Sequence, residues 1–167
     1  LLKLQNKLAE AEPLLREALE IRRKALPAGH PNIATSLNNL GDLLKLQNKL
    51  AEAEPLLREA LEIRRKALPA GHPNIATSLN NLGRLLQAQN KLAEAEPLLR
   101  EALEINRKAL PAGHPDIATT LNNLGDLLKL QNKLAEAEPL LREALEIRRK
   151  ALPAGHPNIA TSLNNLG

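Results

Sequence analysis

Two patterns of apolar residues alternate along the chain. Residues 8–26 carry apolar side chains three or four positions apart, which predicts an amphipathic helix, here called helix B. Residues 31–47 show the same spacing and predict a second helix, helix A, whose inward stripe consists of Ile33, Leu37, Leu40 and Leu44. Residues 27–31 predict a compact connector between B and A, and Asn48 and Lys49 predict a tight turn into the next helix B. The two helices should therefore be antiparallel.

Prolines mark the helix ends and also raise one difficulty. Pro31 suits the first turn of helix A, where its missing N–H costs nothing. Pro55 instead falls well inside helix B, where it removes one backbone hydrogen bond. Because it recurs at the same position of each helix B, we interpret it as a repeated kink within a continuous helix. The alternative is a break into two short helices at every such proline, namely Pro13, Pro55, Pro97 and Pro139.

The pair of helices repeats with a period of 42 residues. The unit that begins at Pro31 restarts at Pro73, Pro115 and Pro157, and residues 1–41 are identical to residues 43–83. A fixed period of this size predicts a stack in which each unit packs on its neighbours. We expect a single repeat domain over residues 1–167, cut within helix A at both ends, with four units at residues 1–42, 43–84, 85–126 and 127–167.

Composition supports a helical core and limits the available chemistry. Leu, Ala and Ile supply the apolar residues, and the chain contains no Cys, Met, Phe, Tyr or Trp. Disulfide and thiol chemistry are therefore excluded. No apolar run is long enough to cross a bilayer and no leader peptide is evident, so we expect a soluble, cytoplasmic protein. The net charge of +4 arises from Lys and Arg interleaved with Glu, which predicts a self-paired, solvated face.

One histidine occurs in each unit, always as Gly-His-Pro, at His30, His72, His114 and His156. A metal site needs its ligands around one ion, whereas equivalent residues of stacked hairpins lie on the order of 10 to 20 Å apart. We therefore expect these histidines to cap helix A or to shape the connector. We predict no metal and no cofactor.

Catalytic and nucleic-acid-binding functions find little support. No Ser, His and acidic group converge within one unit, and a repeated array lacks the asymmetric pocket of an active site, so we expect no enzyme. Arg64, Arg65 and Lys66 cluster at the end of helix B, but Glu59 and Glu62 lie beside them. Phosphate binding would be weak and salt-sensitive, which makes nucleic acid an unlikely partner.

The repeated unit resembles the tetratricopeptide repeat, in the 42-residue variety of kinesin light chain. Leu and Gly at positions 40 and 41 and the residues Leu37, Leu44, Ala53, Leu57 and Ala60 follow the family's order and spacing. The chain departs from the family in carrying Leu at every aromatic position. The resemblance implies an all-α, right-handed α-solenoid of antiparallel helix hairpins, whose A helices line a concave groove that binds a peptide or a partner helix. The resemblance also implies that the chain is a protein–protein interaction scaffold.

The groove positions implied by the resemblance fall on helix A of each unit. In the first full unit they are Thr35, Asn38, Asp42, Lys45 and Leu46, and their equivalents are Thr77, Asn80, Arg84, Gln87, Thr119, Asn122, Asp126, Lys129 and Asn164. One asparagine per unit would then form a row of amides able to donate to and accept from a peptide backbone. These four residues are Asn38, Asn80, Asn122 and Asn164.

The units differ from one another at only six positions: Arg84, Gln87, Ala88, Asn106, Asp116 and Thr120. The first three are spaced i, i+3 and i+4 and share the face of helix A that should line the groove. Two interpretations remain open, a locally altered binding surface and neutral drift on a solvated face.

Two further hypotheses concern assembly and origin. Leu163 and Leu166 at one end, and the uncovered side of helix B at the other, could join copies head to tail, which would make the chain a self-assembling structural element. Its termini could equally be those of a fragment. A consensus design without a biological ligand is the other alternative, because the copies are nearly identical.

Overall fold

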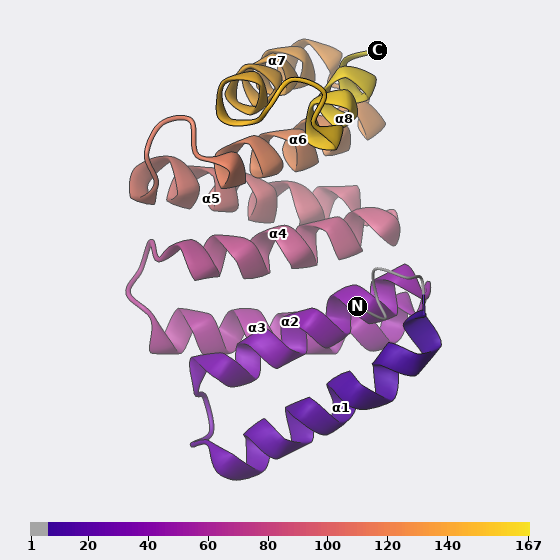
Figure 1. Ribbon diagram of the computed structural model, residues 1–167, viewed down its shortest axis with the longest axis vertical. Helices are drawn as coiled ribbons and strands as arrows, with labels where there is room; N and C mark the ends of the chain where they lie inside the picture. Colours follow the sequence, from indigo (N-terminus) through magenta and orange to yellow (C-terminus); the bar gives the residue numbers. More distant parts are fainter. Residues whose placement is uncertain (1–6) are drawn as a thin grey trace. The chain divides into compact units, whose positions relative to one another are not determined.

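The computed structural model describes residues 7–167, and all the regular secondary structure in this part of the chain is α-helical. Eight helices follow one another in the predicted alternation of B and A (Figure 1). They are α1 (Leu8–Ala25), α2 (Pro31–Leu46), α3 (Leu50–Ala67), α4 (Pro73–Ala88), α5 (Leu92–Ala109), α6 (Pro115–Leu130), α7 (Leu134–Ala151) and α8 (Pro157–Leu166). The helix fragment expected at residues 1–5 lies outside the described residues.

The helices group into two compact units, Leu1–Ala70 with α1 to α3 and Gly71–Gly167 with α4 to α8. Within the first unit, α2 packs against both α1 and α3. Within the second unit each helix packs against the next, and the A helices α4, α6 and α8 also contact one another in sequence. The large side chains that are fully buried in both units are all leucines.

Glycine lets the two helices of a hairpin approach closely. A Cβ atom at Gly83 of α4 would lie only 2.7 Å from Cδ2 of Leu99 in α5. The same contact recurs between Gly41 and Leu57 and between Gly125 and Leu141. Leu99 itself is fully buried, so its side chain occupies the volume that a larger residue at position 83 would need. The Leu-Gly pair of the repeat therefore has a packing role.

The B helices run without interruption through their internal prolines, as the periodicity indicates. The alternative of two short helices is wrong. Each proline is the sixth residue of its helix, where its missing N–H removes a single backbone bond.

Both predicted connections are built from local backbone preferences. Asn48 adopts a φ of 61°, and the backbone N–H of Lys49 donates to the carbonyl of Leu44 at 2.8 Å, which ends α2 in a Schellman motif. At the start of each A helix, the Nδ1 atom of the preceding histidine accepts the N–H of the second helical residue, at 3.1 Å for His72 and Asn74. The predicted capping role of the four histidines is thus confirmed.

Candidate functional site

The A helices of the second unit present a polar face that includes most of the sequence-predicted binding residues. Thr77, Arg84 and Thr119 are exposed, and Gln87 is partly exposed. The hydroxyls of Thr77 and Thr119 donate to carbonyls of their own helices, at 3.2 and 3.1 Å, which leaves their oxygens accessible as acceptors. Because α4 and α6 are in contact, this face spans two successive 42-residue repeats within the second unit.

The same face of α6 combines charge with an exposed leucine. Asp126 and Lys129 are partly exposed, and Leu130, at the end of the helix, keeps 60% of its surface in solvent. Most other A-helix leucines among the described residues form the core. The face therefore presents both charged and apolar groups to solvent.

In the first unit, α2 carries the equivalent residues. Thr35 is exposed, and Leu46 keeps 56% of its surface in solvent. Lys45 Nζ lies 3.1 Å from Asp42 Oδ1, so the two charges largely neutralise each other on this helix. Arg84 replaces this aspartate in α4 and Gln87 replaces the lysine, which leaves α4 without the equivalent ion pair and with an exposed cation.

The expected row of free amides is wrong at three of its four positions. Asn38, Asn80 and Asn122 are buried, with at most 9% of their surface exposed. Asn80 Nδ2 donates to Thr120 Oγ1 at 2.7 Å, and Asn122 Nδ2 donates to the carbonyl of Ala118 at 2.9 Å. The amides of Asn80 and Asn122 are used in packing one A helix on the next, and none of the three buried side chains is open to a ligand. Only Asn164 is exposed.

In the first three Asn-Asn pairs the second asparagine lies closer to solvent. Asn39 is exposed, and Asn123 is partly exposed while its Nδ2 donates to Asn80 Oδ1 at 3.2 Å. Sequence reasoning missed these residues, although a signal was present. Starting from Thr35, steps of four, three and four residues lead to the solvent-facing positions Asn39, Asp42 and Leu46, all on one helical face.

Asp126 is the acid on this face whose protonation is most affected by its surroundings. Partial burial raises the pKa of its carboxyl group, while the nearby charges of Lys129, Arg148 and Arg84 act in the opposite direction. Its Oδ2 atom also accepts a hydrogen bond from Asn165 Nδ2 at 3.0 Å. The carboxylate therefore links α6 to α8 and lies within electrostatic range of Arg84 on α4.

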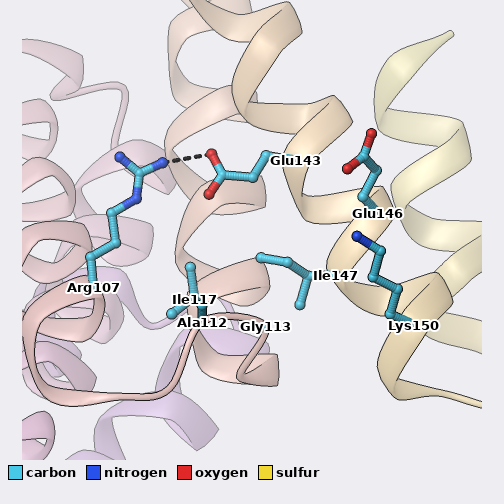
Figure 2. A pocket seen from close by; sticks show the side chains of 8 residues that line it. All are labelled: Arg107, Ala112, Gly113, Ile117, Glu143, Glu146, Ile147 and Lys150. Carbon is cyan, nitrogen blue, oxygen red and sulfur yellow. Dashed lines mark hydrogen bonds and ion pairs between the residues drawn. The ribbon is translucent and has the colours of Figure 1, made fainter.

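A pocket of about 460 Å³ lies elsewhere in the second unit, beside the connector from α5 to α6 (Figure 2). Ile117 and Ile147 contribute its apolar surface but are themselves almost fully buried. Arg107 donates to Glu143 across one side at 2.6 Å. The residues lining it are Arg107, Ala112, Gly113, Ile117, Glu143, Glu146, Ile147 and Lys150. Sequence reasoning did not single out this pocket, and its lining contains no Ser, Thr or His nucleophile or base.

Outside this pocket, ion pairs join successive B helices. Arg16 pairs with Glu52 at 3.0 Å and Arg100 with Glu136 at 2.9 Å, each 36 residues apart in the sequence. The interleaved charges of helix B are thus paired between hairpins as well as along a single helix. Within residues 7–167, no group of three or more His, Asp or Glu side chains is arranged to hold a metal ion. None of the helices described is long and apolar enough to cross a membrane.

Comparison with protein families gives matches along most of the chain. One tetratricopeptide repeat profile matches residues 1–66, and a second matches residues 75–116 and 117–158. Among curated protein sequences, none matches the chain significantly.

Solved structures of similar repeats cover nearly the whole chain. The crystal structure of nearly identical TPR-like repeats named for kinesin light chain, from Podosopora anserina, has a TM-score of 0.81 at 28% identity and covers 99% of this chain and 78% of that one. A crystal structure of a point variant of the same repeats gives a TM-score of 0.82 at 27% identity, with the same coverage. BtubC (BKLC) from P. vanneervenii gives 0.83 at 25% identity and covers 99% of this chain and 66% of that one.

Proposed function

The chain belongs to the tetratricopeptide repeat family, in its kinesin light chain-like form, and from this premise we propose that the exposed face of its A helices binds a peptide or a partner helix. Tetratricopeptide repeats are generally protein-interaction scaffolds and typically not enzymes. The predicted fold class, an all-α solenoid of helical hairpins, is confirmed by the helices and by the solved relatives.

The observation that carries the proposal is the mixed character of the A-helix face in the second unit. Arg84 and Gln87 on α4 lie next to the helix that carries Asp126, Lys129 and Leu130. A peptide on this face would meet a cation, an anion and an exposed aliphatic side chain within two successive hairpins. Interfaces of moderate affinity commonly combine such an apolar contact with surrounding polar groups.

Side-chain amides and hydroxyls add contacts that do not depend on the sequence of the peptide. Thr77 and Thr119 present hydroxyl oxygens, and Asn123 is partly exposed where Asn122 is buried. Asn39, Thr35 and Asp42 form the corresponding set on α2. Such groups suit a peptide backbone, which carries one donor and one acceptor at almost every residue.

The altered positions on α4 provide the sharpest test of this proposal. In the triple variant Arg84→Asp, Gln87→Lys and Ala88→Leu, α4 carries the residues found at the same positions of α2 and α6. All three positions lie at the surface, so the fold should persist. We expect peptides selected on an array by the parent chain to bind the variant about tenfold or more weakly, because the charge at position 84 is reversed.

Matched controls separate this surface from the rest of the molecule. Lys108→Ala changes an exposed residue on helix B and should leave peptide binding unchanged. Equal binding of the selected peptides to the parent chain and the triple variant would reject the A-helix face as the site. Light scattering over a range of concentrations tests the alternative of self-assembly, for which the measured mass would rise with concentration.

A further inference from the structure

Only two of the six positions that distinguish the units are buried, and these two residues contact each other. Asn106, near the end of α5, keeps 3% of its surface exposed, and Thr120 on α6 is completely buried. The other four, Arg84, Gln87, Ala88 and Asp116, are exposed or partly exposed. The cores of the units are therefore interchangeable except at this one contact.

In two of the other repeats the same contact is made by an arginine and a serine. Arg22 Nη1 donates to Ser36 Oγ at 2.9 Å and to the carbonyl of Asn32 at 2.9 Å. Arg148 makes the same two bonds, to Ser162 Oγ and to the carbonyl of Asn158, both at 2.9 Å. The guanidinium group thus ties the end of one helix B to the first turns of the next helix A.

At the junction of α5 and α6 a neutral network replaces this guanidinium contact. Asn106 Nδ2 donates to Thr120 Oγ1 at 3.0 Å, and Asn80 Nδ2 from α4 donates to the same oxygen at 2.7 Å. The hydroxyl of Thr120 donates in turn to the carbonyl of Asp116 at 3.0 Å. This carbonyl is the equivalent of the one that arginine contacts elsewhere. Asn106 is shorter than arginine and donates to the hydroxyl, so Thr120 itself supplies the hydrogen bond to the carbonyl.

The two substitutions also compensate each other in volume. Arginine to asparagine removes side-chain atoms at position 106, and serine to threonine adds a methyl group at a position with no exposed surface. An arginine opposite Thr120 would overfill a packed site, which destabilises a core. An asparagine opposite a serine would leave space and would not supply the second hydrogen bond of the guanidinium.

We propose that the Asn106–Thr120 pair fixes the register in which these nearly identical hairpins stack. If hairpins of two chains pair one unit out of register, Asn106 faces a serine and Thr120 faces an arginine. Each slip therefore creates two mismatches in the core, whereas the correct order creates none. A buried polar contact that specifies register at the expense of sequence symmetry is an established device in repetitive helical assemblies.

The test uses three variants of the full chain: Asn106→Arg, Thr120→Ser and the double variant, which restores the arginine–serine pair of the other units. Each single variant should lower the folding equilibrium constant, Asn106→Arg by about tenfold or more. The double variant should lie within about threefold of the parent chain, because it restores a matched pair. Urea denaturation of all four proteins gives the coupling between the two positions.

The second measurement separates register from simple packing. All four proteins are unfolded, refolded at high protein concentration, and analysed by gel filtration with light scattering. We expect the double variant to give about three times more dimer and larger species than the parent chain, because its units have identical cores. If Asn106→Arg does not fold, Thr120→Ser and the double variant still provide the comparison. Additive single effects would overturn the proposal, as would equal amounts of dimer from the double variant and the parent.

Discussion

Asn106 donates its side-chain amide to the hydroxyl of Thr120 at 3.0 Å, although the two residues are 14 positions apart and belong to different helices, α5 and α6. Arg22 and Ser36, the same distance apart in the sequence, make the corresponding contact in the first unit. Two of the six departures from the repeat are therefore one coupled exchange in the core and cannot be treated as independent changes on a solvated face.

The first prediction concerns the close approach of the two helices in a hairpin. Replacing Gly83 by Ala would place a methyl carbon 2.7 Å from Cδ2 of Leu99, so the leucine or the helices must move. We expect a loss of stability of about 1–3 kcal/mol, measured by urea denaturation. Combining this change with Leu99→Ala should cost less than the sum of the single effects, because the second change removes the clashing atoms. Strict additivity would contradict the packing role of this glycine.

The second prediction distinguishes the two asparagines of the repeated pair. Asn122→Ala removes a buried amide that donates to the carbonyl of Ala118 and to Ser162 Oγ, and we expect it to cost about 1–3 kcal/mol of unfolding free energy. Asn39→Ala changes an exposed residue and should cost less than about 0.5 kcal/mol. Thermal unfolding of the two variants provides the comparison, and similar losses would mean that burial does not separate the two positions.

The third prediction concerns acid stability. Hydrogen bonds from Lys133 and then Arg100, at 2.8 Å each, lower the pKa of Glu96 to about 2, and Glu12 has the same pKa because of Lys49 and Arg16. A lowered folded-state pKa adds stability that is fully present above about pH 4.5 and is lost as the pH falls towards 2. We expect Glu96→Gln to cost about 1 kcal/mol at pH 7, because these ion pairs reach solvent, and to make the acid transition shallower.

Glu138 provides the control for this experiment. It pairs with Arg142 along a single helix, and both side chains are largely in solvent. The Glu138→Gln variant should therefore lose as much stability in acid as the parent chain does. The explanation would fail if Glu96→Gln and Glu138→Gln gave the same denaturation midpoints from pH 2 to 7.

The fourth prediction tests the histidine caps. His72→Ala removes the Nδ1 acceptor for the N–H of Asn74 at the start of α4, and we expect a loss of about 1 kcal/mol. In a protein of this size such a loss lowers the melting temperature by about 2–4 °C. His72→Asn keeps an acceptor at the cap and should recover most of the loss. A histidine that acted only as a spacer in the connector would give equal melting temperatures for the two variants.

The repeat period and the helix boundaries follow from the sequence, because the interactions that fix them are local. The prolines at the start of each helix A, Asn48 in its left-handed turn and the histidine caps act within a few residues of one another. Helical periodicity likewise separates core positions such as Leu37 from surface positions such as Thr35. Even the proline inside helix B did not obscure this pattern.

Only the tertiary structure decided which residues meet across hairpins. Asn122 and Asn123 differ by about 100° around the helix, and either could face a ligand until α4 and α8 are packed beside α6. The stacking of these helices buries Asn80 and Asn122 and leaves the second asparagine nearer to solvent. The packing of α5 on α6 brings Asn106 to Thr120, and α5, α6 and α7 together line the pocket beside the α5–α6 connector. Helix formation depends on contacts close in sequence, whereas these arrangements depend on contacts about 14 to 43 residues apart, which a local pattern does not specify.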